Sequence, residues 1–342
     1  MSGDIVFDDS TLVLGIETSC DETAAALVMG GYDVVSSVVS TQVELHADFG
    51  GVVPEIASRA HLEALNPIVA RAIVESGIEA ERIDAVACTV GPGLIGALLV
   101  GVSAAKSLAL AWDVPFVGVN HMEAHLYAAF LEDPTLEFPL LVLLVSGGHT
   151  MLIEMQDHGQ YRLIGQTIDD AAGEAFDKVA RFLDLGYPGG PAIDQAAMLG
   201  DPEAVRFPRA MLNDGYNFSF SGLKTSVMNY VRKHPEIGSE DVAASFQAAV
   251  VDVLVAKARR AAKEVGATGI VLGGGVAANS LLREEMLEAC QQDGIQGFLP
   301  GRSMCTDNAA MIAAAGWHRL RSDGPTPLDV GAIPNLRLPF ID

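Results

Sequence analysis

The sequence predicts an α/β fold built from two lobes that repeat one layout. Each half of the chain opens with three short apolar segments separated by turns, at residues 12–16, 24–28 and 34–39 and again at residues 140–145, 150–155 and 161–166. Short apolar segments bounded by glycine and polar turns are typical of a β-meander. Because the layout recurs while the residue identities barely match, we expect a duplicated lobe.

Between and after the meanders, helical and strand patterns alternate. Helices are predicted at residues 61–76, 94–112 and 281–290, and buried strands at residues 83–90, 115–119 and 270–272. Strands separated by helices indicate right-handed parallel crossovers.

The expected domain boundaries follow from composition. Residues 131–139 contain two prolines and are the expected hinge. We therefore expect an N-terminal lobe at residues 1–130 and a C-terminal lobe at residues 131–315. The tail at residues 316–342, rich in glycine and proline after Ser322, is expected to pack back on the first lobe.

Length and charge limit the possible partners. The chain has 342 residues, half of them apolar, which suits about two domains with large cores. Its formal net charge is -23, from 44 acidic and 21 basic residues. Such a balance argues against a broad face for nucleic acid or membrane. A local basic patch remains possible, at Arg206, Arg209, Lys224, Arg232 and Lys233.

The expected compartment is the cytoplasm. The first ten residues contain no basic or apolar leader, and no apolar run approaches the roughly 20 residues of a membrane helix. The four cysteines lie far apart in the sequence, which predicts reduced core or turn residues. They are Cys20, Cys88, Cys290 and Cys305.

A metal site is predicted where the pattern turns helical after the strand at residues 115–119. His121 and His125 are four residues apart and therefore share one helical face. Asp307, at the start of a later apolar helix, could add a carboxylate. Two imidazoles and one carboxylate would leave coordination positions open, as in catalytic metal sites. Two half-buried histidines without a metal are the alternative.

Two glycine-rich turns suggest a nucleotide site. Ser146, Gly147 and Gly148 follow an apolar strand and could form a backbone nest for a phosphate. A plain hairpin turn and a nucleophilic Ser146 paired with His149 are the alternatives. Residues 273–275 link a strand to a helix and could admit a base or ribose. We expect the two turns to form opposite walls of one cleft between the lobes.

Several polar residues at helix starts are further candidates. Asp177 and Asp194 are carboxylates beside glycines and suit the hydroxyl groups of a substrate, whereas Glu174 is more typical of a partner for the helix dipole. Asn279 could contact the nucleotide or simply cap its helix.

Eight motifs follow one another in unbroken order along the chain. They are IETSCDET at residues 16–23, HMEAH at 121–125, SGGHT at 146–150, GEAFDK at 173–178, YPGGP at 187–191, SFSGLK at 219–224, GGVAAN at 274–279 and CTDN at 305–308. Together they resemble the TsaD family of tRNA threonylcarbamoyltransferases. The resemblance implies the duplicated two-lobed fold of actin, Hsp70 and sugar kinases. It also implies transfer of threonylcarbamoyl from its adenylate to N6 of the adenosine immediately 3′ of the anticodon, in tRNAs that read codons beginning with A.

The resemblance assigns roles to matching positions. His121, His125 and Asp307 would bind one divalent metal, Fe²⁺ or alternatively Zn²⁺. Asp21 and Glu22 would be catalytic residues that face the substrate. The residues that would bind threonylcarbamoyl-AMP are Leu144, Val145, Ser146, Gly147, Gly148, Asp177, Gly190, Asp194 and Asn279. The implied partners are tRNA and proteins similar to TsaB and TsaE, which could supply the positive surface that this chain lacks.

Three other functions are alternatives. A metallopeptidase would use the histidine pair, but Glu123 lies about 200° around the helix from His121 and should point away from the metal. An ATPase or phosphotransferase of the same fold would favour magnesium held by oxygen ligands alone. A scaffold without activity would not need all three metal ligands.

Overall fold

The computed structural model describes residues 7–341, which form two compact units. The first unit contains the described residues up to Leu136 together with Asp307–Pro339, and the second contains Glu137–Thr306 and the described residues from Phe340 onward. The chain thus passes between units at Leu136 rather than at residue 130. Residues 307–315, expected in the C-terminal lobe, lie in the first unit because the helix that they begin packs on the first sheet.

The first unit is organised around a five-stranded sheet in the order β3-β2-β1-β4-β5. The strands are β1 (Leu12–Glu17), β2 (Glu22–Met29), β3 (Asp33–Thr41), β4 (Ala85–Gly91) and β5 (Phe116–Asn120). The meander strands β1, β2 and β3 pair antiparallel, while β1, β4 and β5 are parallel neighbours. The predicted meander and crossovers are therefore confirmed.

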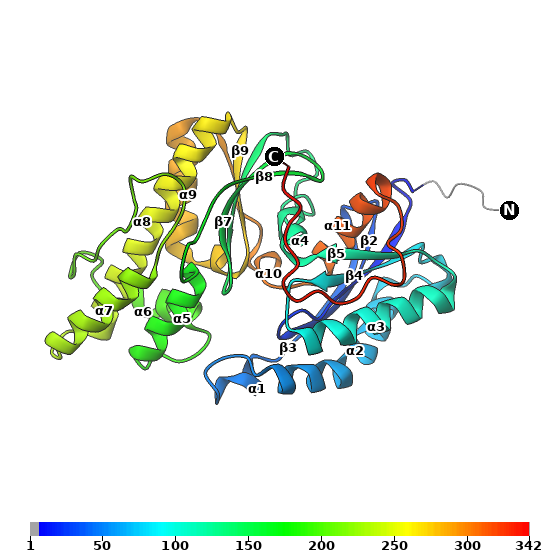
Figure 1. Ribbon diagram of the computed structural model, residues 1–342, viewed down its shortest axis with the longest axis horizontal. Coiled ribbons are helices and arrows are strands. Elements are labelled where there is room, and N and C mark those ends of the chain that lie inside the picture. Colours follow the sequence, from blue (N-terminus) through cyan, green and yellow to red (C-terminus); the bar gives the residue numbers. More distant parts are fainter. Residues whose placement is uncertain (1–6, 342) are drawn as a thin grey trace. The chain divides into compact units, whose positions relative to one another are not determined.

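Helices cover both faces of this sheet (Figure 1). They are α1 (Val43–Ala47), α2 (Pro54–Ser76), α3 (Ile95–Trp112), α4 (His121–Tyr127) and α11 (Ala309–Ser322), with a short 3₁₀ turn, η1 (Ala80–Arg82). Side chains of a strand alternate between faces. Leu14 of β1 shares an apolar core with Leu65 of α2 and Ala105 of α3. The intervening Gly15 faces α11, where a Cβ atom would collide with the backbone of Ala309.

Helix α3 is long and apolar enough to cross a membrane by length and composition alone. Here it packs on β4 and on α2, and part of its surface is buried inside the first unit. Core helices of globular units pass the same test, so α3 is only weak evidence for a membrane span. No other helix in the described part of the chain passes it.

The second unit repeats the topology of the first, with the sheet order β10-β9-β6-β7-β8. Its strands are β6 (Leu140–Val145), β7 (Thr150–Asp157), β8 (Gln160–Gln166), β9 (Gly269–Gly273) and β10 (Gln296–Phe298). Its helices are α5 (Ala172–Phe182), α6 (Gly189–Ala197), α7 (Ser221–Lys233), α8 (Ser239–Val265), α9 (Ser280–Asp293), α10 (Arg302–Cys305) and the 3₁₀ turn η2 (Gly275–Ala278). The shared order of a meander followed by two parallel strands confirms the duplicated lobe.

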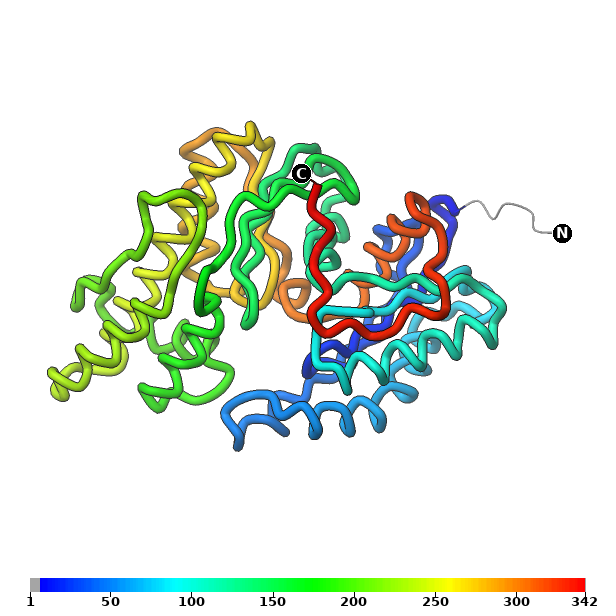
Figure 2. Tube along the Cα trace, in the orientation of Figure 1, coloured from blue at the N-terminus to red at the C-terminus, as the bar shows by residue number. Residues whose placement is uncertain are grey.

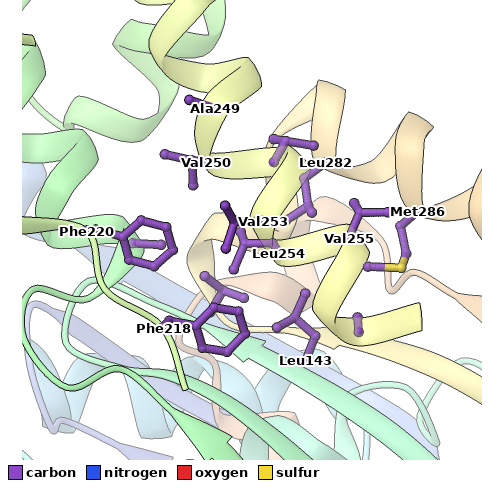
Figure 3. Close-up of a cluster of buried hydrophobic side chains, with 14 of the residues drawn as sticks. Leu143, Phe218, Phe220, Ala249, Val250, Val253, Leu254, Val255, Leu282 and Met286 are labelled. Atoms are coloured by element: carbon purple, nitrogen blue, oxygen red, sulfur yellow. The ribbon is translucent and has the colours of Figure 1, made fainter. Parts of the chain in front are cut away.

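An aromatic and aliphatic core holds α8 against the second sheet (Figure 3). The rings of Phe218 and Phe220 stack with centroids 6.2 Å apart, and they lie in the same core as Leu143 of β6 and Leu254 of α8. The two phenylalanines end an irregular segment that begins near Asp201. Burial of these side chains positions the turns at the carboxyl ends of β6 and β9.

The tail after α11 runs along the first unit (Figure 2, red). Thr326 accepts a hydrogen bond from the backbone of Gly118 in β5, and the backbone of Ile333 donates to Val90 of β4. Nearer the end, Asn120 donates to the carbonyl of Arg337. Phe340 then pairs with Tyr161 in the second unit.

Candidate functional site

The predicted metal ligands converge in the first unit. The Nε2 atoms of His121 and His125 lie 3.4 and 3.3 Å from the same oxygen, Oδ1 of Asp307. All three ligand atoms lie within 4.8 Å of one another. The residues are far apart in the sequence, so the fold rather than local spacing brings the carboxylate to the histidine pair.

His121 and Asp307 each lie at a helix start that a neighbouring asparagine caps, and His125 follows one turn later in α4. Asn120 accepts hydrogen bonds from the backbone N–H groups of Met122 and Glu123, so α4 begins directly at the first histidine. Asn308 accepts from the backbone of Met311 and begins α11 one residue after Asp307. Because β5 ends where α4 begins, the ligands lie at the carboxyl edge of the sheet, where open α/β sheets place ligands.

The donor set suits a divalent transition metal. Two imidazole nitrogens and one carboxylate oxygen match Fe²⁺ and Zn²⁺ better than Mg²⁺, which prefers oxygen ligands alone. Burial alone would lower the pKa of His121, but the carboxylates of Asp307 and Glu17 outweigh burial and hold that pKa well above its usual value. Burial would raise the pKa of Asp307, but His121 and His125 hold it well below its usual value. The carboxylate is therefore ionised, and a cation would replace a proton at His121.

Asp21 ends the turn between β1 and β2, and Glu22 is the first residue of β2. This acid turn lies in the same unit as the metal ligands. Burial, followed by the charges of Asp307 and Asp21, raises the pKa of Glu22 to about 9. The influence of Asp307 places this acid turn within electrostatic reach of the metal ligands.

Backbone hydrogen bonds fix the acid turn from three sides. The carbonyl of Ser19 accepts from Leu94, and the carbonyl of Asp21 accepts from the backbone of Gln42. The carbonyl of Cys20 accepts from Nε2 of the buried His61 at 3.0 Å. The acids are therefore carried on a rigid backbone.

A buried chain of hydrogen bonds determines how His61 is protonated. Nδ1 of His46 accepts from the backbone of Val53, so its Nε2 donates to Oε1 of Gln42. The amide nitrogen of Gln42 then donates to Nδ1 of His61 at 3.3 Å, and Thr23 contacts the same nitrogen at 2.8 Å. Because Nδ1 of His61 accepts hydrogen bonds, it carries no proton and His61 is neutral. The ring proton is on Nε2, which donates a hydrogen bond to the carbonyl of Cys20. Burial lowers the pKa of His61, in agreement with this neutral form.

In the second unit, the predicted phosphate nest follows β6. Leu144 and Val145 are buried strand residues, and the turn closes through a 2.8 Å bond from the backbone of Ser146 to the carbonyl of His149. The Ser146 hydroxyl accepts from the backbone of His149, which describes a turn rather than an activated nucleophile. A Cβ atom at Gly147 or Gly148 would meet no other atom within 4 Å. A ligand can therefore approach this backbone closely.

The second glycine turn lies beside the first, which corrects the expectation of opposite walls between lobes. β6 and β9 are parallel neighbours, with Leu144 opposite Gly273. Gly274 has a φ of +84°, and a Cβ atom there would lie 2.5 Å from the carbonyl of Val145. Both turns belong to one edge of one sheet, because the strand order of the second unit makes their strands adjacent.

Asp177 and Asp194 lie inside α5 and α6, and each contacts the start of a later helix. Asp177 accepts from the backbone of Gly189 at 2.8 Å, at the start of α6. Asp194 accepts from the Ser280 hydroxyl at 2.6 Å and from Asn279 at 3.2 Å. Asn279 also caps α9 through Leu282, so the capping interpretation of this residue is confirmed.

Comparison with known proteins identifies the family. Residues 33–314 match the family profile described as "TsaD: tRNA N6-adenosine threonylcarbamoyltransferase". The chain belongs to the TsaD family. It is 55% identical over 330 residues to the tRNA N6-adenosine threonylcarbamoyltransferase of Symbiobacterium thermophilum, covering 96% of this chain and 97% of that protein. It is 52% identical over 331 residues to the enzyme of the same name from Caldicellulosiruptor saccharolyticus, covering 96% and 98%.

Solved structures extend the likeness of this TsaD-family fold to distant proteins. T. kodakarensis HypF matches with a TM-score of 0.65 at 15% identity, over 92% of this chain and 48% of HypF. Component A of the (R)-2-hydroxyglutaryl-CoA dehydratase of Acidaminococcus fermentans matches with a TM-score of 0.55 at 15% identity, over 91% and 99%. The likeness confirms the expected fold class of actin, Hsp70 and sugar kinases.

Most of the basic patch considered for tRNA has partners within the second unit of this TsaD-family chain. Arg209 pairs with Asp252 at 2.7 Å, Lys224 pairs with Asp170 at 2.7 Å, and Arg232 lies over the ring of Phe182. A tRNA phosphate would have to compete with these contacts.

The four cysteines are free thiols. Burial, with a contribution from Asp21, raises the pKa of Cys20, and burial raises the pKa of Cys88 and of Cys290. Thiols with raised pKa values are poor nucleophiles and poor metal ligands. The predicted role as core or turn residues is consistent with these environments.

Proposed function

We propose that this chain transfers the threonylcarbamoyl group of threonylcarbamoyl-AMP to N6 of the adenosine immediately 3′ of the anticodon, in tRNAs that read codons beginning with A. The observation that carries the proposal is the convergence of His121, His125 and Asp307. The turn that leads into the two acids contacts this cluster, because the Ser19 hydroxyl lies 3.2 Å from Nδ1 of His121. Membership of the TsaD family supports threonylcarbamoyl as the transferred group and tRNA adenosine as its acceptor.

The proposed metal is Fe²⁺, with Zn²⁺ as the alternative, held by His121, His125 and Asp307. When bound, a divalent cation would supply Lewis acidity that polarises the acyl carbonyl. Both histidines can offer Nε2, and the ionised Asp307 offers an oxygen.

Asp21 and Glu22 are proposed to orient the acceptor and take its proton. The N6 amine attacks the carbamoyl carbon, a C–N bond forms, the bond to the phosphate oxygen breaks, and AMP leaves with the electron pair. The N6 proton passes to a carboxylate. A pKa of about 9 would keep Glu22 protonated at neutral pH. A cation held by the metal ligands would lower the pKa of this carboxyl group, because a nearby positive charge favours the ionised form. Glu22 can therefore act as a base once the site holds a cation.

The two glycine turns of the second unit are proposed to bind the adenylate. Their exposed backbone would receive the phosphate, with help from Leu144, Val145, Ser146, Gly147 and Gly148. Asp177, Gly190, Asp194 and Asn279 would surround the nucleoside. Asp194 accepts hydrogen bonds from the side chain of Asn279 and from the backbone N–H and hydroxyl of Ser280, so it would position these residues as well as bind the substrate.

The chain is proposed to work in the cytoplasm with proteins similar to TsaB and TsaE. A net charge of -23 disfavours tight binding of tRNA by this chain alone. Partner proteins would supply positive surface and restore binding.

A metallopeptidase is less consistent with the site. The Glu123 carboxylate, which would have to serve the metal, forms an ion pair with Arg319 at 2.5 Å. This contact agrees with the expectation that Glu123 points away from the histidines.

The test is a reconstituted transfer reaction. The chain, with and without the TsaB-like and TsaE-like partners, is incubated with threonylcarbamoyl-AMP and tRNA, and the digested tRNA is analysed by mass spectrometry. We expect threonylcarbamoyladenosine with the partners present, and strong loss in His121→Ala. His234→Ala, at an exposed histidine of the second unit, is the matched control. Absence of product with every partner combination would contradict the proposal.

A further inference from the structure

A fully buried carboxylate lies behind the metal ligands. Glu17, the last residue of β1, has no exposed surface. Its Oε1 accepts a short hydrogen bond from the backbone of Ser19. Its Oε2 accepts from the Thr89 hydroxyl at 2.7 Å and faces Nδ1 of His121 at 2.9 Å. Burying a charge is costly unless such donors compensate it.

These contacts determine which nitrogen of His121 carries a proton. Thr89 and Ser19 both donate to Glu17, so the carboxylate acts as an acceptor on both oxygens. Its contact with His121 then requires a proton on Nδ1. A neutral His121 with this proton keeps the lone pair of Nε2 directed at the other two ligands.

The second histidine has no comparable partner. Nδ1 of His125 is buried and makes no hydrogen bond to any residue between positions 7 and 341. Glu17 therefore acts on one ligand only, and the two imidazoles of the site are unequal.

The charge of Glu17 also matters. Glu17 and Asp307 together carry two negative charges around His121, which a divalent cation would balance.

We propose that Glu17 is the positioning residue of the metal centre: it holds His121 in the tautomer that binds metal through Nε2, and it makes that nitrogen a stronger donor. The inference rests on the proposed metal site and deepens it. Partners of this kind orient ligand histidines and change metal affinity by about 10- to 100-fold. A role confined to holding β1 against β4 through Thr89 would affect folding and leave metal affinity unchanged.

The test measures metal affinity separately from folding. Chelator-treated protein is titrated with Zn²⁺ against a chromophoric chelator, and with Co²⁺ for its visible absorption spectrum. The variants are Glu17→Gln, which removes the charge, and Thr89→Val, which removes one donor to Glu17 but keeps its charge. Glu123→Gln alters a second buried carboxylate that faces away from the ligands. Unfolding of each metal-free variant is followed by circular dichroism.

We expect Glu17→Gln to bind Zn²⁺ about 10- to 100-fold more weakly and to shift the Co²⁺ spectrum. Thr89→Val and Glu123→Gln should bind nearly as the parent does, even where they unfold more easily. If Glu17→Gln does not fold, Glu17→Asp replaces it. This variant keeps the charge but withdraws it from His121, and it should also weaken Zn²⁺ binding. Parental affinity and spectrum in whichever Glu17 variant folds would overturn the inference.

The outcome is independent of the acyl transfer itself. Weakened Zn²⁺ binding in Glu17→Gln, together with a parent that transfers no threonylcarbamoyl, would support Glu17 and contradict the proposed function. An active parent with unchanged affinity in the variants would do the reverse.

Discussion

The carboxylate of Glu123 and the guanidinium of Arg319 form an ion pair, with Oε2 and Nε 2.5 Å apart. The pair joins α4, which carries both histidine ligands, to α11, which begins directly after Asp307. Glu123 is 1% exposed and Arg319 is 26% exposed at the side chain. The contact therefore connects the two segments that must meet to form the metal centre, although neither residue is a ligand.

Replacing the cation of this pair should destabilise the first unit. In Arg319→Met a buried carboxylate loses a close positive partner, which costs on the order of 3 kcal/mol. We expect a lower free energy of unfolding, measured by urea denaturation. Arg321→Met, on the same helix, is the control, because Arg321 stacks on Trp317 at the surface and should contribute about 1 kcal/mol or less. Equal destabilisation by both changes would contradict the special role of the Glu123 pair.

Asp307→Asn should remove most of the metal affinity with little change in shape. The amide oxygen is a weaker ligand than the carboxylate and carries no charge to balance the cation. We expect a loss at least as large as the roughly 100-fold found for residues that support a ligand. Metal content after gel filtration and chelator competition measure the effect. Asp323→Asn, at the other end of α11, is the matched control.

Metal affinity should rise with pH. Asp307 and Glu17 hold the pKa of His121 well above its usual value against the effect of burial, so a proton occupies the ring at neutral pH. Metal must displace that proton, and the apparent dissociation constant should therefore fall as pH rises toward the raised pKa of His121 and level off above it. Zn²⁺ titrations across this range, in buffers that do not bind metal, test the slope. An affinity independent of pH would show that no proton is displaced.

The hydrogen bond from His61 to the carbonyl of Cys20 gives a prediction for the acid turn. His61→Phe removes that donor and the acceptor that Thr23 and Gln42 use. Buried groups left unpaired cost about 1–3 kcal/mol each. We expect reduced stability and slower acyl transfer with unchanged metal content, because Asp21 and Glu22 lose their fixed backbone. Loss of bound metal together with activity would place the effect at the metal ligands instead.

The same residue predicts how stability depends on pH. Burial lowers the pKa of His61 in the folded state, so the unfolded chain binds its proton more readily. The contribution of His61 to the free energy of unfolding is complete above a pH of about 6.5, the pKa of histidine in an unfolded chain. This contribution is lost as the pH falls below that value and through the lower pKa of the folded state. Thermal unfolding of the parent should therefore become easier between roughly pH 7 and 5. The slope should be smaller in His61→Phe, whose position cannot titrate.

Local spacing made part of the site predictable. His121 and His125 share a helical face by their four-residue separation, and the two meanders are visible as repeated apolar segments. Other features depend on which strands become neighbours. Glu17 is an ordinary residue at a strand end until β1 pairs with β4 and brings Thr89 beside it. The fold also brings the ring of His121 into contact with this carboxylate.

The errors have a related cause. The repeated meanders predict the two glycine turns on opposite walls, but the repeat alone does not determine which strands become neighbours. β9 inserts next to β6, which places Gly274 against Val145. Helix α2 begins at Pro54, earlier than predicted, because proline suits a first helical turn even where the apolar spacing is weak. The helix after Asp307 returned to the first unit because Gly15 leaves room for it on β1.

The glycines of the second unit allow substrate binding to be separated from folding. Gly148 and Gly190 have no atom within 4 Å of an added Cβ, and neither has a positive φ. Gly148→Ala and Gly190→Ala should therefore fold as the parent does, with stability equal to it or higher by about 0.4–1 kcal/mol. If the adenylate lies against this backbone, the added methyl groups should raise KM for threonylcarbamoyl-AMP and weaken binding of an unreactive analogue, measured by calorimetry.

Gly274→Ala is the variant for comparison, because the φ of +84° at Gly274 and the carbonyl of Val145 at 2.5 Å leave no room for a methyl group. That variant should lose stability as well as binding. Full analogue affinity in both Gly148→Ala and Gly190→Ala would show that the adenylate binds elsewhere on the chain.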